Sequence, residues 1–536
     1  MKRTQWTHFT TSTTGRTGLK VVVLLLTASV LLAACGTSKP AAAPLASGSW
    51  PNPNGDLANT RDAADSTISS ANVSKLAQAW TFTLPGTAPC APLCGVQAYG
   101  FIAAAPIVLN GVVYIQDLDS NVYALALTSG KLKWEYKVNA PEQSGPGPNG
   151  VAVVDGAVYG ASPTSAFALN ATTGRTIWVN SHLLGKGQGT FGIQPQVASG
   201  RVYLASQYGS GSGGGILLAL NASTGEVLWT FNTVLSPDPG VQAIGTGTGG
   251  AWETPLVSSD GSVTYGIGNP YQSAASAIAY PSAQLYTDSA VNLDAATGKL
   301  RWYYQGVPDD FKDYDMQASP IAATVNGVAV VIGSGKMGIV YEMNAQTGKL
   351  IWKTPVGQHN GHDDDSPRAL AGTSTLEAPY TILPGSFGGV LTNMALAGTS
   401  VYVVTSDLPT TFTSLTQVLP VSAGSLTGEV EALNLATGQI EWDTKVADLP
   451  LGAATVSNDL VFTTLYHGIL IALNRDTGAI VYRQNLPTST NAPLAIAGNT
   501  VIVPAGGPTT SSANANPLSP ANTDEGNPQV VAYTAP

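Results

Sequence analysis

Residues 165–178 read Ser-Ala-Phe-Ala-Leu-Asn-Ala-Thr-Thr-Gly-Arg-Thr-Ile-Trp. The apolar run predicts a strand, Asn-x-x-Thr-Gly predicts a turn, and an aromatic residue follows four positions after the glycine. An internal repeat of this kind indicates a supersecondary unit that buries its faces only against neighbouring copies. This cassette, with close variants of the turn, occurs seven times, with its glycine and aromatic residue at Gly130 and Trp134, Gly174 and Trp178, Gly225 and Trp229, Gly298 and Trp302, Gly348 and Trp352, Gly438 and Trp442, and Gly478 and Tyr482.

The first copy shows a repeat of four strands. Apolar runs 105–109 and 112–116 are joined at Asn110-Gly111, a dipeptide that turns a hairpin tightly because both residues tolerate positive φ. Predicted strands 121–127 and 131–137 follow. Four strands per repeat are typical of a β-propeller blade. Similar hairpin signals precede later cassettes at Asp155-Gly156, Ser199-Gly200, Asp260-Gly261, Asn326-Gly327 and Ala397-Gly398.

The two ends of the chain determine the number of blades. After Tyr482 the sequence predicts three more strands, at 494–497, 500–504 and 529–534. The fourth strand of that blade is supplied by residues 75–83, which carry Trp80 at the cassette's aromatic position. We therefore predict an all-β fold, an eight-bladed β-propeller of four-stranded antiparallel blades closed by the N- and C-terminal strands. Seven blades are the alternative.

The N-terminus has the pattern of an export signal. Residues 1–20 carry four basic and no acidic side chains, and residues 21–34 are almost wholly apolar. The sequence Leu-Ala-Ala-Cys-Gly at 32–36 resembles the lipobox of bacterial lipoproteins, in which cleavage leaves a lipid-bearing cysteine, here Cys35. We predict a lipoprotein signal peptide at 1–34, a flexible tether at 35–49 and a propeller domain at 50–536. The protein is then expected outside the cytoplasm, held to a membrane of the cell envelope through Cys35.

The net charge and the cysteine content argue against some partners and cofactors. The formal net charge of −10, without basic clusters, argues against nucleic acid as a partner. In an exported chain the pair Cys90 and Cys94 is more typical of a small disulfide than of a metal site. Because no Cys-x-x-Cys-His sequence occurs, covalent haem of the c type is not encoded. Electrons removed from a substrate would have to leave through another protein or a soluble acceptor.

Uneven repeat lengths locate insertions. Trp229 and Trp302 are 73 residues apart, and Trp352 and Trp442 are 90 residues apart, more than four short strands need. Loops on a rigid scaffold tend to carry functional sites.

The cassettes resemble the repeats of pyrroloquinoline quinone (PQQ) dependent dehydrogenases, eight-bladed quinoproteins that oxidise alcohols or sugars with a Ca²⁺-bound quinone near the propeller axis. Residues 50–61, Trp-Pro-Asn-Pro-Asn-Gly-Asp-Leu-Ala-Asn-Thr-Arg, resemble that family's N-terminus. So do Ala-Asn-Val-Ser-Lys-Leu at 71–76, followed by Trp80. The resemblance covers roughly residues 50–535.

The resemblance implies a site of four residues. Trp252 falls where an indole stacks on the quinone, and Asn269 falls where an amide oxygen binds Ca²⁺. Asp313 falls where a carboxylate beside the metal acts as catalytic base, and Lys336 matches a cation that contacts the quinone oxygens. Each residue also has a structural interpretation: Trp252 as blade packing, Asn269-Pro270 as a turn, Asp313 as a loop cap and Lys336 as a solvated rim charge.

The sequence departs from the family pattern at three places. The family's carboxylate ligand to Ca²⁺ should lie near Ser210, but residues 207–215 contain no acid. Glu253 or the run 363–365 could replace it. The adjacent cysteine pair under the cofactor has no counterpart, and Pro148-Asn149 replace an expected arginine before Gly150.

A second cluster of polar residues lies in the longest insertion, where residues 359–365 read His-Asn-Gly-His-Asp-Asp-Asp. Carboxylate oxygens suit Ca²⁺, and imidazole suits transition metals. Glycine within this stretch and Pro367 after it favour a loop, so an acidic solvated loop is the preferred interpretation.

Two function hypotheses follow. In the first, the protein is a lipid-anchored PQQ- and Ca²⁺-dependent dehydrogenase of an alcohol-like substrate, with an unidentified electron acceptor. In the second, it is a non-catalytic propeller that binds envelope proteins, similar to the outer-membrane assembly lipoproteins that share this repeat.

Overall fold

The structure, a computed structural model, describes residues 48–85, 102–138, 148–207, 209–210, 214–234, 246–272, 277, 284–363, 365, 379–414, 418–419, 426–506 and 528–536. The predicted signal peptide, Cys35, Cys90 and Cys94 lie outside these residues. Residues Leu45–Pro536 belong to one compact unit. Within the described part of the chain, no helix is long and apolar enough to cross a membrane.

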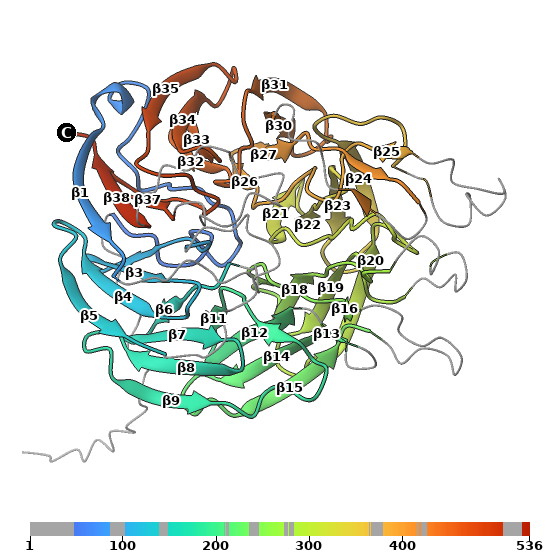
Figure 1. The fold of residues 1–536 in the computed structure, drawn as a ribbon, viewed down its shortest axis with the longest axis horizontal. Helices are drawn as coiled ribbons and strands as arrows, with labels where there is room; N and C mark the ends of the chain where they lie inside the picture. Colours follow the sequence, from blue (N-terminus) through green and yellow to red (C-terminus); the bar gives the residue numbers. More distant parts are fainter. Residues whose placement is uncertain are drawn as a thin grey trace, which may run out of the picture. The chain divides into compact units, whose positions relative to one another are not determined.

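The described strands form eight blades around an axis, as the sequence predicted (Figure 1). Each blade is antiparallel, and its first strand lies nearest the axis. The first four blades are β2 (Ile107–Leu109), β3 (Val112–Gln116), β4 (Val122–Ala126) and β5 (Leu132–Tyr136); β6 (Ala152–Val154), β7 (Ala157–Ser162), β8 (Ser165–Asn170) and β9 (Thr176–Asn180); β11 (Gln196–Ala198), β12 (Arg201–Gln207), β14 (Ile216–Asn221) and β15 (Val227–Asn232); and β17 (Leu256–Val257), β18 (Ser262–Gly266), β19 (Ser289–Asp294) and β20 (Leu300–Gln305).

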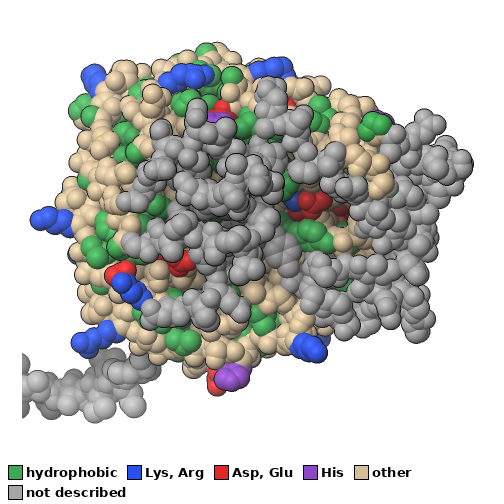
Figure 2. Space-filling view, in the orientation of Figure 1, with side chains coloured by type: hydrophobic (Ala, Val, Ile, Leu, Met, Phe, Trp, Pro, Cys, Tyr) green, Lys and Arg blue, Asp and Glu red, His purple; other side chains and the backbone are tan. Residues whose placement is uncertain are grey.

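The remaining blades complete the ring. They are β21 (Ile321–Val325), β22 (Val328–Gly333), β23 (Ile339–Asn344) and β24 (Leu350–Pro355); β26 (Ala395–Ala397), β27 (Ser400–Ser406), β30 (Gly428–Asn434) and β31 (Ile440–Val446); β32 (Thr455–Ser457), β33 (Leu460–Leu465), β34 (Ile469–Asn474) and β35 (Ile480–Asn485); and β36 (Ala495–Ala497), β37 (Thr500–Ala505), β38 (Gln529–Thr534) and β1 (Ala77–Thr83). Figure 2 shows the same face with side chains, with lysines and arginines spread along its perimeter and acidic side chains gathered in a hollow right of centre.

The last blade joins the two ends of the chain. Strand β1 pairs antiparallel with β38, from Ala77 opposite Thr534 to Thr83 opposite Gln529. Lys75, expected at the start of this strand, instead ends a short 3-10 helix formed by residues 73–75. This pairing leaves no open edge between the first and last blades, and the prediction of eight blades closed by both termini is confirmed.

The long repeats carry extra strands, as their lengths indicated. Strands β13 (Gly209–Ser210) and β16 (Thr246–Thr248) form a two-stranded sheet. In the longest repeat, β25 (Tyr380–Ile382), β28 (Thr410–Phe412) and β29 (Val418–Leu419) form a three-stranded sheet. Strand β10 (Thr190–Phe191) pairs with the C-terminal end of β12.

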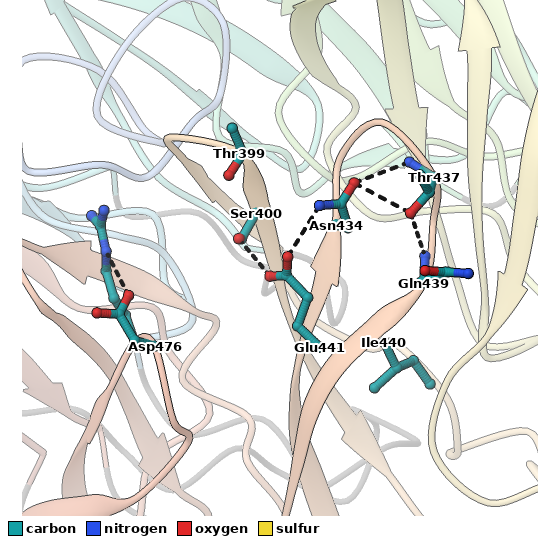
Figure 3. A pocket seen from close by; sticks show the side chains of 9 residues that line it. Thr399, Ser400, Asn434, Thr437, Gln439, Ile440, Glu441 and Asp476 are labelled. Atoms are coloured by element: carbon teal, nitrogen blue, oxygen red, sulfur yellow. Dashed lines mark hydrogen bonds and ion pairs between the residues drawn. The ribbon is translucent and has the colours of Figure 1, made fainter.

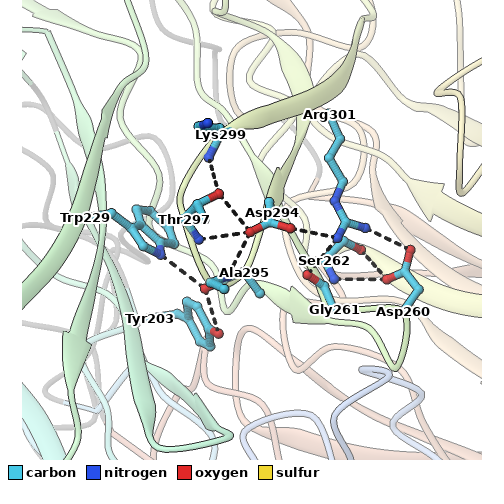
Figure 4. A network of polar contacts seen from close by, with 11 residues as sticks. Tyr203, Trp229, Asp260, Gly261, Ser262, Asp294, Ala295, Thr297, Lys299 and Arg301 are labelled. Atoms are coloured by element: carbon cyan, nitrogen blue, oxygen red, sulfur yellow. Dashed lines mark hydrogen bonds and ion pairs between the residues drawn. The ribbon is translucent and has the colours of Figure 1, made fainter.

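The cassette turn is held by its first side chain. In Figure 3 the Asn434 Oδ1 atom accepts hydrogen bonds from the backbone N–H and the hydroxyl of Thr437, both at 3.2 Å. In Figure 4 Asp294 takes the same position and accepts from Thr297 in the same way, at 2.9 and 2.8 Å. A side chain that mimics a backbone turn explains why Asn or Asp opens most copies of the cassette.

The cassette tryptophan joins neighbouring blades. The Trp229 Nε1–H group donates to the Ala295 carbonyl in the turn of the next blade, at 3.1 Å (Figure 4). The glycine of each turn lies against the tryptophan ring of the preceding blade, and a Cβ atom at Gly174 would lie 2.7 Å from the Trp134 ring. These aromatic residues are therefore packing elements, as their spacing indicated.

We expect Gly174→Ala to destabilise the propeller by about 1–3 kcal/mol more than Gly111→Ala does. Both glycines have positive φ, 68° and 72°, so both variants carry the same backbone cost. Only Gly174 faces a ring, whereas a Cβ at Gly111 meets no atom within 4 Å. Urea denaturation of the two variants measures the difference, and equal midpoints would contradict the packing role.

Part of the N-terminal segment, residues 58–61, hydrogen bonds to the strands nearest the axis. Arg61 is fully buried and donates to the Ala454 and Leu494 carbonyls at 2.7 and 2.8 Å, and to the Thr455 hydroxyl at 2.7 Å. The Asn59 amide donates to the Pro320 carbonyl at 2.9 Å. These contacts join this segment to the beginnings of three blades.

Candidate active site

Four loops bring the predicted site residues to one face of the ring. Trp252 lies just before β17 and Asn269 lies shortly after β18. Asp313 lies between β20 and β21, and Lys336 lies between β22 and β23. In an antiparallel blade, the start of the first strand and the ends of the second and fourth strands share one face. The blade topology therefore places residues from two consecutive blades side by side.

Three of the predicted residues are in direct contact. The Asn269 side-chain amide hydrogen bonds to Asp313 Oδ1. Lys336 Nζ lies 3.0 Å from Asp313 Oδ2 and 2.5 Å from Asp315 Oδ2. The Asn269 backbone N–H donates to Asp315 Oδ1 at 2.7 Å. The structure thus assembles an Asn, two carboxylates and a lysine, of which Asp315 was not singled out from the sequence.

Asp313 is the more accessible of the two carboxylates that contact Lys336. Its side chain is 30% exposed, whereas that of Asp315 is fully buried. Burial raises the pKa of Asp313 to about 7, with the Asp315 charge raising it further and Lys336 opposing both. A carboxyl with a pKa near 7 can accept or donate a proton at neutral pH.

Trp252 differs from the seven blade aromatics. It is half-buried, and its six-membered ring lies against Gly268, where a Cβ atom would be 2.8 Å from the ring. The same Cβ atom would lie 2.8 Å from Asp315 Oδ1. Gly268 directly precedes Asn269. The indole is therefore next to the carboxylate and amide groups described above.

Two further buried carboxylates lie near this group. Asp310 accepts hydrogen bonds from the backbone N–H groups of Lys312 and Tyr314, both at 2.8 Å. Asp288, at the start of β19, is fully buried, and burial together with the charges of Asp310 and Asp315 raises its pKa well above the usual range. Sequence reasoning missed Asp288, because it belongs to no motif and only precedes an apolar strand.

Of the acids suggested as replacement ligands, the three that the structure describes have other partners. Glu253 accepts a hydrogen bond from the Asn393 amide at 2.9 Å, and burial raises its pKa to about 7. Asp363 pairs with His359 and Asp365 pairs with His362, both at 2.7 Å. Asp364 lies outside the described residues. These acids have protein partners of their own, away from Asn269.

The stretch from His359 to Asp365 is a loop where the structure describes it, as its glycine indicated. Lys312 joins it to the site by donating to the His362 and Asp363 carbonyls at 3.0 and 2.8 Å. Asn149, which stands near the expected arginine, is buried and donates to the Asp117 carbonyl and the Ser120 hydroxyl at 3.2 and 3.1 Å.

A pocket of about 680 Å³ lies elsewhere in the propeller (Figure 3). It lies between cassette turns, and its acid Glu441 is held by Ser400 and Asn434 at 2.7 and 3.1 Å. It contains none of the predicted site residues.

A third group of acids lies at the edge of the β27–β30–β31 blade. The side chains of Glu429, Glu431 and Asp443 come within 4.8 Å of one another, and Lys445 pairs with Glu429. Glu431 accepts from the Gly357 backbone N–H at 3.0 Å. Burial and the charges of Glu429 and Asp443 raise the pKa of Glu431 from its ordinary value of 4.5 to about 8.

This pKa predicts a pH effect on stability. Because the folded state binds the Glu431 proton more tightly than the unfolded state, its contribution to stability is present below pH 4.5 and is lost as the pH rises to about 8. We expect Glu431→Gln to remove this loss, so the variant gains most relative to wild type at about pH 9. Urea denaturation at about pH 5 and about pH 9 measures it, with exposed Glu226→Gln as control. A variant with the wild-type pH slope would contradict the assignment.

The fold and the site together define a propeller with a group of carboxylates on one face, beside the half-buried indole of Trp252. The family profile described as glucose/ethanol/alcohol dehydrogenase, β-propeller domain, matches residues 50–156 and 189–364, more than half of the chain. The chain therefore belongs to this family of quinoprotein propellers. A second profile, outer membrane protein assembly factor BamB, matches residues 426–529.

Individual proteins support the same grouping. The chain is 28% identical over 378 residues to the quinohemoprotein alcohol dehydrogenase of Comamonas testosteroni, covering 63% of this chain and 51% of that enzyme. It is 24% identical over 477 residues to the quinoprotein alcohol dehydrogenase PedH of Pseudomonas putida, covering 77% of each. The chain spans about half the length of several curated relatives, the Comamonas enzyme among them.

Solved structures confirm the fold. The crystal structure of the Comamonas enzyme superposes with a TM-score of 0.74 at 21% identity, covering 91% of this chain and 80% of that one. A europium-containing methanol dehydrogenase superposes with a TM-score of 0.71 at 19% identity, covering 91% and 98%.

Proposed function

We propose that this protein is an exported, lipid-anchored quinoprotein that oxidises an alcohol-like substrate with bound PQQ and a metal cation. The observation that carries the proposal is the direct contact among Asn269, Asp313 and Lys336, with Trp252 beside them. If Lys336 were only a solvated rim charge and Asp313 only a loop cap, contacts among these side chains would not be expected. Lipid anchoring through Cys35 remains part of the proposal.

The residues present fit a hard cation. The site combines an amide with several carboxylates, and such oxygen donors are the ligands of Ca²⁺ and of larger trivalent ions. Lys336 is the single cation that ion-pairs with these carboxylates among the described residues, so the group has an excess of negative charge. Asn269, Asp313 and Asp315 would hold the metal.

The residues also fit one face of a planar quinone. The Trp252 ring would stack on it, and Lys336 would attract its oxygens. When bound, such a quinone accepts the hydride that an alcohol loses on becoming an aldehyde or a ketone. Asp313, partly exposed and with a raised pKa, would take the hydroxyl proton, while Lys336 fixes the carboxylate in place. An external electron acceptor would then reoxidise the cofactor.

The proposal predicts that PQQ quenches the tryptophan fluorescence of the purified protein in a saturable, cation-dependent way. Trp252→Ala should abolish binding, because it removes the stacking face, whereas Trp252→Phe keeps an aromatic plane and should retain part of the affinity. Equilibrium dialysis with Ca²⁺ and, in parallel, Eu³⁺ measures the affinity directly. Absence of PQQ binding with either cation would exclude the dehydrogenase.

The match of residues 426–529 to the assembly-factor profile favours a second candidate, a propeller that binds envelope proteins. Failure of PQQ to bind, together with co-purification of a defined outer-membrane protein from native envelopes, would favour this candidate.

A further inference from the structure

Among the acids of this part of the propeller that the structure describes, Asp288 is the one whose carboxylate lacks any hydrogen-bond donor. The residue is 0% exposed, and neither of its carboxylate oxygens has a partner among the described residues. Its backbone is fixed on both sides: its N–H donates to the Gly268 carbonyl at 3.1 Å, and its carbonyl accepts from Gly306 at 2.8 Å. Asn269 follows Gly268 directly, so Asp288 is anchored next to the predicted metal ligand.

The three neighbouring acids each have at least one hydrogen-bond or ion-pair partner. Asp310 receives two backbone N–H groups, and Asp313 and Asp315 share Lys336. These three acids and Lys336 are the charged groups that act on Asp288. A buried carboxylate without a hydrogen bond is strongly unfavourable, and the charges of three more acids around it increase the cost, which the charge of Lys336 opposes.

The sequence lacks an acid where the family supplies one. Residues 207–215 carry no carboxylate, and Glu253, Asp363 and Asp365 have protein partners elsewhere. We propose, resting on the function proposed above, that Asp288 supplies the missing negative charge of the cation site, acting with Asn269, Asp313 and Asp315. Asp288 immediately precedes β19, in the same blade as β18, which leads into Asn269. A bound cation of charge two or more would add the counter-charge that Lys336 alone does not supply to four acids.

The test measures cation binding without PQQ, by calorimetric titration of the full-length protein with Ca²⁺ and by luminescence titration with Tb³⁺. We expect Asp288→Asn to weaken binding by about 10- to 100-fold. Asparagine keeps the size of the side chain and tolerates the positive φ of 50° at this position. The matched control is Asp155→Asn, an exposed aspartate at the same φ of 50°, which should bind like wild type.

Thermal unfolding gives a second readout that a folding defect would not reproduce. Without cation, Asp288→Asn should unfold at the same temperature as wild type or above it, because an unpaired buried charge is removed. Saturating cation should raise the unfolding temperature of wild type by more than it raises that of the variant. Equal affinities of wild type and Asp288→Asn would overturn this inference and leave the proposed function intact. No cation binding by wild type would overturn both.

Discussion

Asp313→Asn is expected to lower the rate of alcohol oxidation by about 10²- to 10⁴-fold. The substitution removes the group that would take the hydroxyl proton but keeps the shape of the side chain. An asparagine can still face Asn269 and Lys336, so the fold and the quinone face beside Trp252 should persist. The measurement is alcohol-dependent reduction of an artificial electron acceptor by protein loaded with PQQ and cation.

Two controls separate proton transfer from cofactor loss. PQQ binding by Asp313→Asn, followed by Trp252 fluorescence, should remain detectable at concentrations used for turnover. Asp155→Asn, far from the site on a hairpin, should turn over like wild type. Undiminished turnover by Asp313→Asn with bound PQQ would show that another group accepts the proton.

The second large effect concerns stability. We expect Arg61→Met to destabilise the propeller by about 3–5 kcal/mol, because it leaves buried acceptors without their donor. Arg61 serves Asn54, Thr455 and the carbonyls of Ala454 and Leu494, which come from separate parts of the chain. Arg61→Lys should recover little, since an ammonium group does not reproduce the planar fork of the guanidinium group.

Urea denaturation measures this effect, with exposed Arg175→Met as the control. Burial lowers the pKa of Arg61 to about 9. An Arg61→Met variant as stable as Arg175→Met would mean that the axial segment does not join the blades.

The fold was predictable because its determinants are local. Each cassette places its turn residues, its Gly and its aromatic residue within nine residues. The pairing of β1 with β38 followed from counting strands at both ends. The hydrogen bond from Trp80 to the Leu127 carbonyl repeats the contact made by the other cassette tryptophans.

The candidate site was only partly predictable. Asn269, Asp313 and Lys336 stand in short motifs that the family resemblance could locate, and their contact follows from loops that share a face. Asp288 could not be found in this way, because its place depends on the pairing of β18 with β19 and on the burial of everything around it. Arg61 was quoted only as part of an N-terminal motif, and its role on the axis depends on the beginnings of strands hundreds of residues away.

The most direct test of the account is a crystal structure of the protein reconstituted with PQQ and Eu³⁺, because the anomalous signal of europium locates the cation without ambiguity. The account predicts one strong peak beside Asn269, Asp313 and Asp315, with the quinone against the Trp252 ring. A peak at another place, or density for neither cation nor quinone at this face, would contradict it.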